Sequence, residues 1–312
     1  MSALICGSMA YDNIMVFPGR FQEQILPDQI HILNVAFLVP EMRREFGGCA
    51  GNIVYNLSLL GAEGYAMATV GEDFTAYDGW LAQQSLDKRY LTEVAGTLTA
   101  QAYITTDLDD NQITAFHPGA MDHSHTNVIP ADAGIKVGMI SPDGRQGMID
   151  HARQFAEAGI PFVFDPGQGL PMFGKEDLQE FIELAAWVAV NDYEGQMLQE
   201  RTGWSVKEIG QRVEALIVTR GAKGSMIYTG TEQIAIPVVE ATEVRDPTGC
   251  GDAYRAGLLY GLLNDMSWED TGRLAAILGS NKIASLGTQN HTFTRASVDD
   301  QFERSFGYRL GL

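Results

Sequence analysis

The stretch of the chain whose residue types best suit chemistry is Asp246-Pro-Thr-Gly-Cys-Gly-Asp252, which runs directly into an apolar segment, 253–263. The apolar segment predicts a buried helix that begins near Gly249. The first amides of a helix lack partners within it and lie at the positive end of its dipole, so they suit an anion. A carboxylate at Asp252 would repel a phosphate there unless it accepts a proton beside it. The stretch predicts an anion hole with a general base, and a capped tight turn is the alternative.

Three other stretches carry polar side chains or glycines in patterns that suit a ligand. They are Gly47-Gly-Cys-Ala-Gly-Asn52, Asn191-Asp-Tyr-Glu194 and Thr219-Arg-Gly-Ala-Lys-Gly224. The second and third follow predicted strands, and ligands of α/β proteins bind at the carboxyl ends of strands. Asn191 and Glu194 could equally cap a helix. The chain contains no G-x-x-x-x-G-K-[ST], G-x-S-x-G or H-E-x-x-H motif.

The elements that must position these residues alternate along the chain. Short β-rich runs lie at 3–6, 65–70, 137–141, 162–165, 187–191 and 216–219, and amphipathic helices are expected at 146–158 and 177–186. This alternation predicts an α/β fold with a central, mostly parallel sheet flanked by helices on both faces. We expect a single domain spanning residues 1–312.

Two segments interrupt the alternation. Residues 14–38 read as a strand and loop, and residues 101–116 read as two strands around the turn Asp109-Asp110-Asn111. Neither segment has a helix that would complete a βαβ unit. We therefore predict a small second sheet, a lid formed by about 14–38 and 101–116, with extra edge strands of the main sheet as the alternative.

Composition excludes several classes of partner. The 312 residues are 45% hydrophobic and carry 21 Lys and Arg against 40 Asp and Glu, a net charge of -19. Nucleic acids and anionic membranes are bound through Lys and Arg, so neither is an expected partner. The N-terminal apolar stretch ends at Gly7 without a basic region, so no signal peptide is predicted. We expect a cytoplasmic protein whose Cys6, Cys49 and Cys250 are reduced.

Two of the stretches described above, 47–52 and 246–252, resemble the two signatures of the ribokinase-like (PfkB) carbohydrate and nucleoside kinases. Asp246-Pro-Thr-Gly-Cys-Gly-Asp252 is similar to the C-terminal signature, and Gly47-Gly-Cys-Ala-Gly-Asn52 with Leu57, Leu60 and Gly61 to the N-terminal one. The signatures stand at the correct ends of the chain, so the resemblance covers essentially all of it. One departure is Cys250, because the family usually has alanine at this position.

The resemblance implies a role for each matched residue. Asp252 would be the catalytic base, and the amides of Gly249, Cys250 and Gly251 the anion hole. The implied substrate contacts are Asp12, Gly47, Gly48 and Asn52, with Phe116 of the lid stacking on a base. The implied ATP contacts are Asn191, Thr219, Arg220, Gly221, Gly224 and, more weakly, Asn281. Glu194 would organise Mg²⁺, and Asp246 stands where some members bind a monovalent cation such as K⁺.

The acceptor that the resemblance implies is a nucleoside. The stretches 110–116 and Phe164-Asp-Pro-Gly-Gln168 look most like the nucleoside-kinase branch. We expect transfer of the ATP γ-phosphate to the ribose 5′-hydroxyl, with adenosine as the first candidate and inosine, guanosine or cytidine as further ones, and with a role in purine salvage. The alternatives are a sugar kinase of ribokinase or fructokinase type and a non-catalytic sensor on the same fold. Lid sheets in this family can pair, so a homodimer is a further expectation.

Two groups of side chains allow competing interpretations. His117, Asp122, His123 and His125 have irregular spacing, which favours a polar loop over a metal site. The helix dipole would make the Cys250 thiol more acidic, whereas Asp252 nearby opposes its ionisation.

Overall fold

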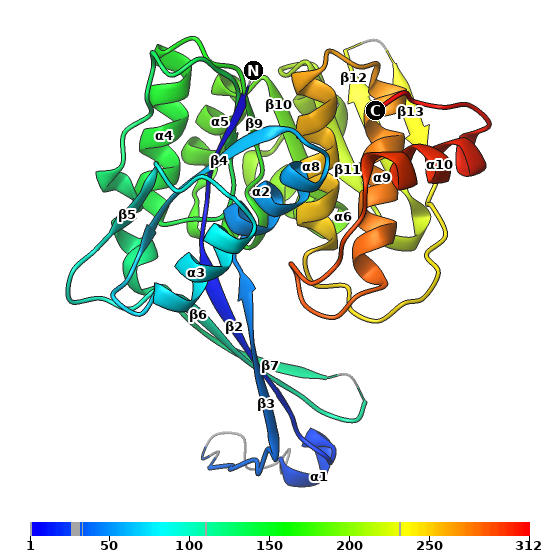
Figure 1. Cartoon of the computed structure of the whole chain (residues 1–312). Coiled ribbons are helices and arrows are strands. Elements are labelled where there is room, and N and C mark those ends of the chain that lie inside the picture. The colour runs from blue at the N-terminus through cyan, green and yellow to red at the C-terminus, as the bar shows by residue number, and fades with distance from the viewer. Residues whose placement is uncertain (1, 26–31, 33, 110, 231) are drawn as a thin grey trace.

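A nine-stranded sheet forms the body of the protein (Figure 1). The structure is a computed structural model that describes residues 2–25, 32, 34–109, 111–230 and 232–312. The strand order is β13-β12-β11-β10-β9-β8-β1-β4-β5, in which the strands from β11 to β5 are parallel and β12 pairs antiparallel with both β11 and β13. The strands are β1 (Ser2–Cys6), β4 (Glu63–Val70), β5 (Leu91–Glu93), β8 (Ile135–Ile140), β9 (Phe162–Phe164), β10 (Trp187–Asn191), β11 (Ala215–Thr219), β12 (Ser225–Thr229) and β13 (Gln233–Ile236). The predicted parallel α/β sheet is confirmed.

Helices cover both faces of this sheet because its strands are apolar on both faces. Alternate residues of β1 belong to different cores, with Ala3 and Ile5 in one and Leu4 and Cys6 in the other. The first core contains side chains of α2 (Cys49–Leu59), α3 (Thr75–Gln83), α8 (Cys250–Leu263), α9 (Trp268–Ile283) and α10 (Arg295–Phe306). The second contains side chains of α4 (Arg145–Glu157), α5 (Lys175–Leu184), α6 (Asp192–Thr202) and α7 (Val206–Gly210). No helix of the described residues is long and apolar enough to cross a membrane.

A separate four-stranded sheet projects from the body (Figure 1), as the interrupted alternation predicts. Its order is β3-β2-β6-β7, and the edge-strand alternative is wrong. The strands are β2 (Ala10–Val16), β3 (Glu41–Gly47), β6 (Ala100–Thr106) and β7 (Gln112–His117), and a short helix, α1 (Phe21–Gln24), follows β2. We refer to this four-stranded sheet as the lid.

The bounds of the lid differ from the predicted ones. Its first strand begins at Ala10, and β3 lies wholly beyond residue 38. Strand β3 was not predicted because its charged sequence, Glu-Met-Arg-Arg-Glu-Phe-Gly, offers little of the apolar alternation typical of a strand. Residues 26–31 and 33 of the predicted segment lie outside the described residues. The division of the chain into one domain stays a prediction.

The predicted hairpin is present as the antiparallel pair β6 and β7, which ends at Thr106 opposite Gln112. The Asp107 carboxylate organises the connection, since it accepts hydrogen bonds from the amides of Asp109 (3.0 Å) and Asn111 (2.9 Å). It also accepts one from the amide of Phe21 (2.8 Å), which ties α1 to the hairpin. Residue 110 of the predicted turn lies outside the described residues.

Candidate active site

A cavity of about 1600 Å³ lies between the lid and the carboxyl ends of the main strands. Residues at or just after the ends of β8, β9, β10 and β11 line it, which is where parallel sheets bind ligands. The predicted residues that line it are Asp12, Gly48, Asn52, Phe116, Asn191, Glu194, Thr219, Gly221, Gly224, Gly249, Cys250, Gly251 and Asp252. The structure thus brings together stretches that are far apart in the sequence.

The start of α8 forms one wall of this cavity. Gly249 is the N-cap and adopts a left-handed conformation with φ of 77°. A Cβ atom on Gly249 would lie 3.0 Å from Cγ2 of Thr288, so both backbone conformation and space require glycine there. The amide of Cys250 donates to the carbonyl oxygen of Pro247 (3.2 Å). That amide therefore belongs to the turn, which differs from its predicted place in the anion hole, and the amides of Gly249 and Gly251 stay the predicted donors.

Asp252 lies in the first turn of α8 and lines the cavity. Its Oδ2 atom accepts a hydrogen bond from Nδ2 of Asn52 at 2.7 Å. Burial, together with the charge of the nearby Asp165, raises the pKa of Asp252 to about 6, although the Asn52 hydrogen bond and Arg255 oppose the increase. A carboxyl group with a pKa near 6 is mostly ionised at neutral pH yet accepts a proton readily, as a general base must.

A chain of buried amides fixes the orientation of Asn52. Nε2 of Gln289 donates to Oδ1 of Asn52 (3.0 Å) and to the hydroxyl of Tyr77 (2.6 Å). Oε1 of Gln289 accepts from Nε1 of Trp80 (2.9 Å). Because the Asn52 oxygen faces Gln289, its NH₂ group must face Asp252. Gln289 was not predicted from the sequence, and no local pattern marks it.

Asp12 reaches the cavity from β2 of the lid. Burial, together with the charges of Asp252, Asp246 and Glu45, raises the pKa of Asp12 to about 7. Gly47 does not line the cavity, but a side chain there would collide with the Asp12 carboxylate, so this glycine makes room for Asp12.

The lid also supplies the apolar part of the cavity wall. Phe116 pairs with Ala102 in the β6–β7 ladder, and its side chain is 51% exposed. Ile104 of β6 and Met121 and Met172 of the body line the cavity with it. This part of the cavity can take a flat apolar group.

A buried ion pair lies beside Asp252 and was not predicted from the sequence. Arg255 of α8 binds both oxygens of Asp165 through Nε (3.2 Å) and Nη2 (3.0 Å). Its Nη2 atom also lies 4.0 Å from Oε2 of Glu194. Glu194 accepts from the amide of Asn191 (2.8 Å) and Asn191 caps α6 in return, so the helix-cap interpretation of these two residues is confirmed. Both residues also line the cavity.

The predicted nucleotide-binding turn follows β11. Gly224 has φ of 77° and accepts a hydrogen bond from the amide of Arg220 (2.8 Å), which closes the turn. Thr219, Gly221 and Gly224 line the cavity, whereas Arg220 does not. On α9 the residues that line the cavity are Ala276, Gly279, Ser280 and Ile283, and Asn281 is not among them. The residues of α9 that line the cavity are therefore mostly small, and Asn281 does not belong to them.

The two ambiguous groups are also placed. Asp122, His123 and His125 lie on a 3-10 helix (Gly119–Thr126), and within the described residues no group of three His, Cys, Asp or Glu side chains is placed to hold a metal ion. Cys250 lines the cavity, and burial raises its pKa to about 11, which outweighs the expected effect of the helix dipole.

Comparison with known proteins agrees with this geometry. Residues 8–295 match the family described as pfkB family carbohydrate kinase. A nucleoside kinase of Methanocaldococcus jannaschii is 32% identical over 273 residues, which cover 87% of this chain and 90% of that protein. The structure of a Burkholderia thailandensis nucleoside kinase in complex with inosine is 52% identical, with a TM-score of 0.90 and coverage of 98% of this chain and 99% of that one. A structure of the same enzyme in complex with ADP and inosine is 54% identical, with a TM-score of 0.88 over 98% and 97% of the two chains. The chain therefore belongs to the pfkB family of carbohydrate kinases and is a phosphotransferase.

Proposed function

We propose that this protein is an ATP-dependent nucleoside kinase that transfers the γ-phosphate of ATP to the ribose 5′-hydroxyl of a purine nucleoside. The observation that carries the proposal is the Asp252 carboxyl group, which lies at the N-terminus of α8, faces the cavity and has a pKa of about 6. Adenosine is the first acceptor to test, and inosine is the second because the Burkholderia relative is described in complex with it.

In this proposal each wall of the cavity has one task. Asp252 accepts the proton of the 5′-hydroxyl, and the amides of Gly249 and Gly251 stabilise the transferring phosphoryl group. Asp12 accepts hydrogen bonds from ribose hydroxyls. Asn52 holds the catalytic base, Asp252, in place. Any contact of Asn52 with the ribose would therefore be made by the same side-chain amide that binds Asp252.

The apolar part of the cavity wall supports a nucleoside over a free sugar. Phe116, Ile104, Met121 and Met172 would contact a nucleobase, and a sugar alone would leave this surface without a partner. A ribokinase- or fructokinase-like activity remains the alternative acceptor class, and a sensor without turnover is the alternative outside catalysis.

Magnesium enters with the ATP and offsets the charge of its phosphates. The donor set that faces the cavity near α6 is oxygen-rich, with Glu194, Asn191 and Asp165. Because Arg255 occupies both oxygens of Asp165 and the amide of Asn191 occupies Oε2 of Glu194, these residues suit an ion held through water molecules rather than directly. Burial raises the pKa of Glu194, and a bound cation would favour its charged form.

The deciding experiment is a coupled ADP-release assay with adenosine, inosine, guanosine, cytidine, ribose and fructose as acceptors. We expect turnover with purine nucleosides and little with free sugars. Asp252→Asn should lower kcat by roughly 10²–10⁴-fold, because it keeps the size of the side chain and removes its basicity. Turnover only with ribose or fructose would favour the sugar kinase, and none with any acceptor would favour the sensor.

Pairing of two copies through the lid stays a prediction. Val16, Met42, Tyr103 and Ile113 of the lid strands are exposed apolar side chains that a second copy could cover. Sedimentation of the ligand-free protein would give the mass of the particle in solution.

A further inference from the structure

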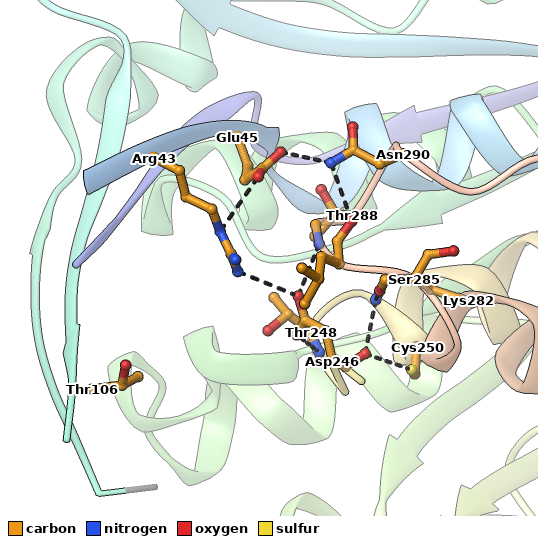
Figure 2. Close-up of polar contacts among 12 residues, drawn as sticks. Arg43, Glu45, Thr106, Asp246, Thr248, Cys250, Lys282, Ser285, Thr288 and Asn290 are labelled. Carbon is orange, nitrogen blue, oxygen red and sulfur yellow. Dashed lines mark hydrogen bonds and ion pairs between the residues drawn. The ribbon is translucent and has the colours of Figure 1, made fainter. Parts of the chain in front are cut away.

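The last turn of α9 contains a completely buried lysine. Lys282 has a relative exposure of 0%. Its Nζ atom donates to the carbonyl oxygens of Asp246 (2.8 Å) and Ser285 (3.1 Å), as Figure 2 shows. Burying an ammonium group is costly unless hydrogen bonds and nearby negative groups compensate, so a lysine in this position needs a specific explanation.

The ammonium group joins two segments of the chain that build the start of α8. The first segment is 245–249, which ends at the N-cap Gly249, and the second is 283–288, which begins at the last residue of α9. The amides of Arg245 and Asp246 donate to the carbonyl oxygen of Ile283 (2.9 and 3.2 Å). Lys282 adds a bond across the same junction to Asp246 and a bond within the second segment to Ser285. The positively charged ammonium group of Lys282 thus binds the loop that contains the anion-hole amides.

The Asp246 carboxylate completes this junction. Its Oδ1 atom accepts from the amide of Thr248 (2.9 Å) and its Oδ2 atom from the amide of Gly287 (2.9 Å). The other charged group beside it is Arg43 of the lid, whose Nη2 lies 4.0 Å from Oδ2 of Asp246 (Figure 2). Burial lowers the pKa of Lys282, whereas Asp246, Cys250 and Asp252 favour its charged form.

The family resemblance implies a monovalent cation at Asp246, and the residues present do not fit one. A K⁺ ion would need several free oxygen atoms. Here the Asp246 carbonyl is bound by Nζ, and both carboxylate oxygens accept backbone amides. The buried ammonium would also repel a second cation only a few ångströms away.

We propose that the Lys282 ammonium group is a built-in monovalent cation that positions the anion-hole loop, so that phosphoryl transfer by this chain does not depend on K⁺. The proposal rests on the proposed kinase function for its activity readout. Lys282 is a positioning residue, because it is fully buried and is not among the residues that line the cavity.

The first experiment compares the parent protein in KCl, NH₄Cl and choline chloride at equal ionic strength. Three quantities are measured: kcat, the affinity for ADP by calorimetry, and Tm. We expect each to be the same in the three salts, with kcat and the dissociation constant within about twofold. A requirement for K⁺, seen as a rise of roughly tenfold or more in kcat or ADP affinity over choline, would overturn the proposal. If no acceptor is phosphorylated, the kinase function fails, while ADP affinity and Tm still test the inference.

The second experiment removes the ammonium group. In choline chloride, Lys282→Ala should lose roughly tenfold to a hundredfold in kcat and in ADP affinity, because two carbonyl acceptors lose a charged donor. Methylammonium, NH₄⁺ or K⁺ should restore much of both quantities, since a small cation can enter the vacated space. An unaffected variant, or a loss that none of these cations restores, would contradict the proposal.

Lys136→Ala is the matched control. Nζ of Lys136 also donates to a helix-terminal carbonyl, that of Leu263 (2.9 Å), and pairs with Asp265, but it lies at the far end of α8. Small cations should not change its kcat or ADP affinity. If Lys282→Ala does not fold in choline, recovery of a cooperative melting transition in methylammonium replaces kcat as the readout, and failure to recover it counts against the proposal.

Discussion

Replacing Gln289 with leucine should move the pH dependence of the reaction without touching the cavity. Gln289 is buried, does not line the cavity and holds the oxygen of Asn52 (3.0 Å). In Gln289→Leu the Asn52 amide loses the contact that fixes its orientation. Its NH₂ group is then no longer held on Asp252, and the charged form of Asp252 loses a stabilising donor.

The size of the change follows from the hydrogen bond at risk. A bond to a charged group contributes roughly 1.5–3 kcal/mol, and one pKa unit corresponds to about 1.36 kcal/mol, so losing it raises the pKa by about one to two units. Asp252 acts as a base in its ionised form, so kcat/KM rises as pH increases through the pKa of the free enzyme. The parent should show this rise near pH 6, because the pKa of Asp252 is raised to about 6. In the variant the rise should move to higher pH, while the plateau at alkaline pH is retained.

The assay is kcat/KM for the best nucleoside between pH 5 and 9 in the parent and in two variants. Because Asp12 titrates near Asp252, the acidic limb belongs to the pair, and the difference between parent and variant is the informative quantity. Trp80→Phe removes only the donor to Oε1 of Gln289, so its displacement should have the same sign and be smaller. An acidic limb that does not move, with kcat/KM lowered by one factor at every pH, would refute the orienting role of Gln289.

Three further predictions concern buried ionisable groups. Burial raises the pKa of Asp143 to about 8, above its unfolded value, so the stability that Asp143 contributes is present at low pH and lost as pH rises through 8. The Tm of the ligand-free protein, measured by calorimetry, should therefore fall between pH 6.5 and 8.5, and the fall should be smaller in Asp143→Asn. Arg255→Met leaves Asp165 buried without its partner and should lower the free energy of unfolding in urea by about 3–5 kcal/mol, and an unchanged midpoint would contradict this. Because the pKa of Cys250 is raised to about 11, iodoacetamide at pH 7.5 should modify this thiol more slowly than a free thiol, and ADP should slow the modification further. Mass spectrometry of Cys250→Ala, with Cys49→Ala as control, identifies the modified site. Modification at the rate of a free thiol would contradict the burial of Cys250.

Much of the fold could be predicted from the sequence because its signals are local. The buried strands of the main sheet are short apolar runs. Helix α8 is predicted by the glycines at its start and the apolar segment that follows them. The lid hairpin has turn residues between two alternating strands. Strand β3 was missed because most of its residues are charged or polar and it forms an edge of the lid sheet rather than part of a buried core.

The supporting residues of the site could not be predicted because their roles come from contacts that are distant in sequence. Gln289 binds Asn52 across 237 positions, and Arg255 binds Asp165 across 90. An isolated glutamine or arginine within a helix or loop has no pattern that distinguishes it from a surface residue. Lys282 is the clearest case, since its sequence position suits an exposed last-turn lysine, whereas the structure buries it completely.

The bond between Asn52 and Asp252 has a consequence for how the protein is made. Its two partners are 200 residues apart in the chain, so at about 5–20 residues per second the ribosome adds the second roughly 10–40 s after the first. During that interval Asn52 and the lid exist without the helix that completes the cavity, and the amide that orients the base has no base to bind. Nascent or prematurely terminated chains that lack α8 should therefore be inactive and susceptible to proteases. Kinase activity should appear during synthesis only after the last helices have been added.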